Sequence, residues 1–226
     1  MNEPIGLSEI FKSAGTIYKT NFRLYLSLSL LFAVTTVAIS KILGVQNSND
    51  PSAFIYMIIS TLISSWFSIS LIYASVFLLQ GKNISFSQAL RMPRERYISY
   101  LLVNAMLILL VMCGFFLFII PGIYFAVVYN FASTLTVLEK TDFKTSFVKS
   151  MSLVKGYFFP ILGFFGVVVV CVFFPEIAAT PIKGANPSMG LAISRIISTL
   201  VVPFIMIAQV ALFLRMTEIK KDQYLA

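Results

Sequence analysis

The side chains best placed for chemistry are the few polar ones inside long apolar runs. Asn104, Asn130 and Gln209 are amides in three different runs, and Arg195 is a formal charge placed within a run. Lipid offers an amide no hydrogen-bond partner and makes a charge costly, so such residues mark either internal pairs or functional sites. For the amides, interhelical pairing and a polar site for a substrate both remain open. For Arg195, the alternatives are a functional site and a side chain that snorkels to the headgroups.

Other catalytic chemistry has little support in the sequence. The chain has no His, and Cys113 and Cys171 both lie in apolar runs, where a cysteine behaves as a small hydrophobe. The nine acids are scattered, and the chain contains neither a phosphate-binding loop nor a nucleophile elbow. We therefore expect no metal, no cofactor and no enzymatic activity.

Composition indicates a polytopic membrane protein. Of 226 residues, 58% are hydrophobic and 12% are charged, and the mean hydropathy is +0.91. Soluble domains carry roughly 25% charged residues. In a soluble domain the net charge of +8 would suggest nucleic acid, but here the cations must first be assigned to membrane sides, and we expect no nucleic-acid partner.

Six apolar runs are candidates for transmembrane helices, which need about 20 residues each. The fourth is the shortest, since about 16 residues at 1.5 Å rise cover roughly 24 Å. The first is too long for a signal-peptide core, and we interpret it as an uncleaved anchor. The predicted spans are Leu24 to Leu43, Ala53 to Leu79, Tyr100 to Ile120, Ile123 to Leu138, Phe158 to Phe174, and Leu191 to Leu214.

The basic residues indicate the orientation. If the N-terminus is cytoplasmic, only Lys41, Lys183 and Arg195 of the 17 Lys and Arg fall outside. This asymmetry follows the positive-inside rule and predicts that both termini are cytoplasmic.

The segments before the odd-numbered spans share a spacing of four and then eleven residues between apolar positions. We infer three divergent units, 1–80, 81–140 and 141–226, each with a cytoplasmic interfacial amphipathic helix followed by a helical hairpin. Ser85 and Gln88 are spaced as a capping box, and Pro93 predicts that the second interfacial helix is short or bent. The repeated positions are Leu7, Phe11 and Phe22; Phe86, Leu90 and Leu101; and Phe143, Phe147 and Phe158.

Breaks and stripes in the apolar runs predict the remaining architecture. Pro121 and Gly122 would form the external turn of the middle hairpin, and Pro203 would kink the last span. The segment from Pro175 to Gly190 has three prolines and is expected to be an external loop. A stripe of serines in the second span favours close helix packing or, alternatively, a polar path: Ser60, Ser64, Ser68 and Ser75.

Three hypotheses follow for function. In the first, basic residues of the interfacial helices bind anionic lipid headgroups while aromatic residues of the same helices enter the acyl boundary, so that the protein organises envelope or lipid components. In the second, the chain is a transporter or channel with a cavity bounded by Asn104, Asn130 and Gln209; the third is a lipid enzyme whose acids converge from separate loops. A second copy or another membrane protein remains open as a partner. The headgroup-binding candidates are Lys12, Lys19, Arg91, Arg94, Arg96, Lys149 and Lys155.

The sequence also resembles a known family. Ser8 to Lys12, Tyr18 to Phe22, the turn Ile120 to Ile123, and Val137 to Lys140 resemble the YciC family of uncharacterised bacterial inner-membrane proteins. The more distant resemblance is to the membrane domain of glycerophosphodiester phosphodiesterases, without their catalytic barrel. Relatives often have Pro where this chain has Ser133. The resemblance implies a six-span protein of the bacterial inner membrane and no catalytic residue.

Overall fold

The computed structural model describes residues 6–44, 51–185 and 187–225, and these contain helices and connecting turns but no strand. The α-helices are α1 (Leu7–Thr20), α2 (Phe22–Ile42), α3 (Pro51–Leu79), α4 (Phe86–Arg91), α5 (Tyr97–Leu117), α6 (Ile119–Val128), α7 (Ala132–Leu138), α8 (Phe143–Val154), α9 (Phe158–Ala185) and α10 (Pro187–Leu225). A short 3₁₀ helix, η1 (Met92–Glu95), follows α4.

Six stretches are long and apolar enough to cross a membrane, which confirms the predicted number by length and composition. The fourth, Ile119–Leu138, comprises α6 and α7 with a non-helical break between them. The protein is therefore an all-α, multi-pass membrane protein. The six stretches are Phe22–Ile42, Pro51–Leu79, Tyr97–Leu117, Ile119–Leu138, Phe158–Ile182 and Ile193–Lys221.

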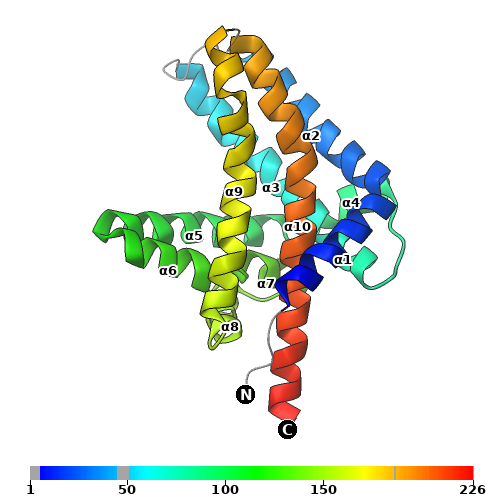
Figure 1. The fold of residues 1–226 in the computed structure, drawn as a ribbon, viewed down its shortest axis with the longest axis vertical. Coiled ribbons are helices and arrows are strands. Elements are labelled where there is room, and N and C mark those ends of the chain that lie inside the picture. The colour runs from blue at the N-terminus through cyan, green and yellow to red at the C-terminus, as the bar shows by residue number, and fades with distance from the viewer. Residues whose placement is uncertain (1–5, 45–50, 186, 226) are drawn as a thin grey trace.

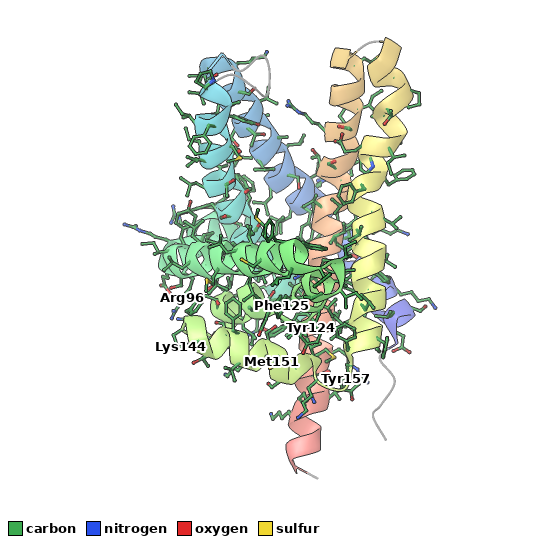
Figure 2. The ribbon with its side chains drawn as sticks, turned by 90° about the vertical axis from the view of Figure 1, so that its left-hand side faces the viewer. Arg96, Tyr124, Phe125, Lys144, Met151 and Tyr157 are labelled. Carbon is green, nitrogen blue, oxygen red and sulfur yellow. The ribbon has the colours of Figure 1, made fainter. Side chains whose placement is uncertain are left out.

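The helices run in two main directions. Helices α9 and α10 pack side by side along the long axis, and α2 and α3 meet at the same end as the α9–α10 connection (Figure 1). Helices α5 and α6 pack against each other and run crosswise to α9 and α10 in both views (Figures 1 and 2). Since α9 and α10 lie crosswise to α5 and α6, the two pairs cannot both follow the membrane normal.

Helix α10 is the centre of the packing. It contacts α1, α2, α3, α8 and α9, and its buried residues Ile207, Leu212 and Met216 belong to the largest hydrophobic cluster. Helix α1 lies across it with Ile10 and Ala14 buried, which explains why apolar residues recur on one face of this charged segment.

The turn of the middle hairpin differs from the prediction. Helix α5 ends at Leu117, Phe118 is extended with φ −163° and ψ 158°, and α6 begins at Ile119. The predicted hinge residues Pro121 and Gly122 therefore lie in the first turn of α6. Proline is tolerated there because the first N–H groups of a helix have no intrahelical acceptor.

The predicted loop from Pro175 to Gly190 is also wrong over its described residues. Helix α9 continues through Pro175 and Pro181 to Ala185, and α10 begins at Pro187. Prolines are tolerated within membrane helices where neighbouring groups compensate for the missing hydrogen bond.

Local signals in the second unit are confirmed. Ser85 Oγ accepts a hydrogen bond from the Gln88 N–H at 3.3 Å, and Gln88 Oε1 accepts one from the Ser85 N–H at 3.0 Å. Helix α4 then ends after six residues, and Pro93 lies in the 3₁₀ turn that follows. The capping box and the early end of this helix were both readable from the sequence.

Candidate functional site

A cleft lies between three of the candidate spans, α2, α3 and α10. It measures about 260 Å³ and includes Glu176 from α9. Its walls combine apolar side chains with several hydroxyl groups and one guanidinium group. The lining residues are Leu28, Ser29, Phe32, Ala33, Thr36, Tyr56, Ser64, Phe67, Ser68, Leu71, Glu176, Ser194, Arg195, Ser198, Thr199 and Val202.

Two charged residues line this cleft without pairing to each other. Glu176 accepts a hydrogen bond from Ser194 Oγ at 2.9 Å, whereas no ion pair of Arg195 is found among the described residues. The Arg195 side chain therefore retains its donors. Of the four predicted intramembrane polar residues, Arg195 is the one that lines the cleft.

The backbone beside Arg195 adds an acceptor. Pro203 lies inside α10 and has no N–H, so the carbonyl of Thr199, four residues earlier, lacks its usual helical donor. Thr199 lines the cleft. The predicted kink residue thus leaves a polar backbone group near the cavity.

The serine stripe of α3 divides between the two interpretations. Ser64 and Ser68 line the cleft, as the polar-path interpretation requires. Ser75 is fully buried and lies 3.3 Å from the Tyr25 hydroxyl, and its Oγ also donates to Leu71 O, as the packing interpretation requires. Only the middle part of the stripe, Ser64 and Ser68, therefore belongs to the candidate site.

The three predicted amides form two separate pairs outside this cleft. Ser133 Oγ donates to Asn104 Oδ1 at 3.2 Å, and Gln209 Nε2 lies 3.4 Å from both Asn130 Oδ1 and the Asn130 carbonyl. Asn130 lies in the break between α6 and α7, which turns its side chain toward α10. These hydrogen bonds are those that the interhelical-pairing interpretation of the amides requires.

One atom of this arrangement is left without a partner. Asn130 Nδ2 is buried and makes no hydrogen bond with the described residues. An unpaired buried amide nitrogen costs about 1–3 kcal/mol. Gln209 Nε2 contacts the oxygen of the same Asn130 amide, not its nitrogen.

The predicted headgroup-binding residues are mostly exposed. Lys12 and Lys19 lie on α1, Arg91 on α4 and Arg94 on η1, and Arg96 is half-buried before α5. Lys149 forms an ion pair with Glu139, whereas ion pairs among the described residues involve none of the other six. We call the exposed and unpaired residues the basic set: Lys12, Lys19, Arg91, Arg94 and Lys155.

The aromatic residues of these helices face protein more than was expected. Phe11 stacks on Phe164 and Phe204, with ring centroids at 5.5 and 6.3 Å. Phe147 lies 5.0 Å from Tyr129. The expectation that such rings enter the acyl boundary is wrong for Phe11, because its ring is used to attach α1 to α9 and α10.

The end of α1 is held by one long-range hydrogen bond. Tyr18 Oη donates to Leu200 O at 2.9 Å. Partial burial raises the pKa of Tyr18 above its ordinary value of 10, so the phenol keeps its proton near neutral pH. This contact joins the first basic helix to the part of α10 that borders the cleft.

No group of three or more His, Cys, Asp or Glu side chains comes together among the described residues. The two cysteines are both free, Cys113 on α5 and Cys171 on α9. The described acids likewise form no shared centre.

Comparison with known proteins adds no relative. No protein-family model, no curated protein and no solved structure matches this chain. Sequence reasoning placed Glu176 in an external loop, and the absence of a helical signal across Pro175 hid its position beside the cleft.

Proposed function

We propose that this chain is a non-catalytic inner-membrane protein that binds anionic lipid headgroups at its cytoplasmic face and so organises or assists lipid or envelope components. Both termini would be cytoplasmic, with α1, α4 and α8 near that face. The observation that carries the proposal is the basic set: five exposed cations, from three parts of the chain, with no partner acid among the described residues.

The proposed attraction is electrostatic. A Lys or Arg near an anionic leaflet contributes about 1 kcal/mol, and the effect declines within a Debye length. Because Phe11 and Phe147 are engaged by other aromatic rings, insertion of these side chains adds little. The affinity should therefore depend strongly on salt.

The test compares two neutralised variants in nanodiscs that contain spin-labelled phosphatidylglycerol or phosphatidylcholine. Changing all five residues of the basic set to Gln should abolish the preference for phosphatidylglycerol. The matched control is Lys149→Gln, which removes a cation already paired with Glu139 and should change the preference little. An unchanged preference in the fivefold variant would refute the proposal.

A second candidate function is transport of a small or lipidic solute, and the cleft at Arg195 favours it. Transporters commonly bind substrate between helical hairpins within the membrane. The deciding measurement is flux into proteoliposomes for the parent chain and for Arg195→Gln. Equal and background-level flux in both would end this candidate without affecting headgroup binding.

A further inference from the structure

An apolar groove runs along the outside of α2 and α10 and meets the cleft at Arg195. It measures about 510 Å³ and shares Ala33, Arg195 and Thr199 with the cleft. Its lining is apolar except for two cations and one hydroxyl group. The lining residues are Leu26, Leu30, Ala33, Val34, Val37, Ala38, Lys41, Arg195, Ile196, Thr199 and Leu200.

The charges of the two cations are the next feature of the groove. Lys41 and Arg195 take part in none of the ion pairs of the described residues, and no acid lines the groove. Glu176 lines the adjoining cleft and is hydrogen-bonded to Ser194. Two cations in an otherwise apolar groove favour an anion with an apolar body.

The shape of the groove suits one acyl chain. Leu26, Leu30, Val34 and Val37 recur at helical spacing on one face of α2, and Leu30 and Val34 are 48% and 63% exposed. From Lys41 to Leu26 the helix rises about 22 Å, compared with about 15 Å for the hydrocarbon of one leaflet. An acyl chain whose headgroup is held at Lys41 can therefore lie along this face of α2 through the full depth of one leaflet.

We propose that this groove binds an anionic phospholipid from the surrounding leaflet, with its phosphate between Lys41 and Arg195 and one acyl chain along α2. A guanidinium and an ammonium group together form charge-assisted hydrogen bonds to phosphate. The occupant comes laterally from the bilayer because Leu30 and Val34 open the groove to lipid. This site is separate from the basic set, and its failure leaves headgroup binding at the other cations standing.

The experiment measures lipids retained by the purified full-length chain in detergent, using native mass spectrometry after delipidation. The probes are phosphatidylglycerol and phosphatidylcholine with the same acyl chains, and the variants are Lys41→Gln, Arg195→Gln and the double change. Each lost charge should weaken phosphatidylglycerol retention about fivefold, because one cation near an anionic headgroup contributes about 1 kcal/mol. Lys82→Gln, in the loop after α3, is the matched control and should retain lipid like the parent.

A second variant tests the acyl part without changing charge. Val34→Trp fills the groove at an exposed position and should lower phosphatidylglycerol retention while circular dichroism and elution volume stay those of the parent. A short-chain phosphate ester that competes equally well would show that the cations alone bind, which overturns the acyl part of the proposal. Equal retention of phosphatidylglycerol and phosphatidylcholine, or no effect of the double change, overturns the site and leaves Arg195 as a snorkelling residue.

Discussion

Gly114 on α5 faces Gly122 on α6 so closely that a Cβ atom added at Gly114 would lie 2.8 Å from the Gly122 Cα atom. Backbone meets backbone at this point, so no flexible side chain can move away. Gly114 and Gly122 each lie four residues from the turn at Phe118, and their contact allows α5 and α6 to approach each other closely. It explains why Gly122 is needed although it does not form the turn itself.

The first prediction is that Gly114→Ala destabilises the α5–α6 hairpin. Overpacking of this kind costs about 1–3 kcal/mol, and here the obstacle is backbone. Gly166→Ala in α9 is the matched control, because an added Cβ meets nothing within 4 Å there. Thermal unfolding in detergent should show a lower midpoint for the first variant and no loss for the second; equal midpoints would contradict the close contact.

Apolar runs were enough to predict the number of candidate spans, because length and hydropathy are local properties. They could not predict the direction of α5 and α6 relative to α9 and α10, since all four helices are apolar on nearly every side. The charge pattern could not help either: a hairpin that crosses the bilayer and one that lies in it leave Arg96 and Lys140 on the same side.

Proline was a weaker guide. Pro93 marks the end of a short helix as predicted, but α9 continues through Pro175 and Pro181. Whether a proline ends a helix depends on partners supplied by other helices, which a single sequence does not reveal. For the same reason the cleft was missed, since Glu176 and Arg195 approach it from different helices.

The second prediction concerns the tip of the crosswise hairpin. If α9 and α10 cross the membrane, the crosswise helices α5 and α6 lie along its plane (Figures 1 and 2). The exposed apolar tip at Phe118 then stays in the acyl region. In a Cys113→Ala, Cys171→Ala background, Phe118→Cys should not react with an impermeant maleimide added on either side. Ile42→Cys and Asn83→Cys are controls for the two sides. Labelling of Phe118→Cys from the side that labels Ile42→Cys would show that the hairpin crosses.

The third prediction concerns buried hydroxyl groups that attach α8 to α7. Ser146 Oγ lies 2.8 Å from Thr136 Oγ1 and 2.7 Å from Thr141 Oγ1, and Ser146 is fully buried. Ser146→Ala leaves these hydroxyls without that partner and should lower the free energy of unfolding by about 1–3 kcal/mol. Ser152→Ala on the exposed side of the same helix should be nearly neutral, and an equal loss in both variants would assign the effect to helix propensity.

The fourth prediction concerns the attachment of α1. Phe11 stacks on Phe164 and Phe204, and Tyr18 donates to the Leu200 carbonyl, so the helix is held at two levels of α9 and α10. Phe11→Ala should release α1 and increase protease cleavage after Lys12 and Lys19, whereas Tyr18→Phe keeps the ring and should cost about 1 kcal/mol. Phe116→Ala on α5 is the control, because Phe116 is 94% exposed. If all three variants resist protease equally, α1 is not attached through these aromatic contacts.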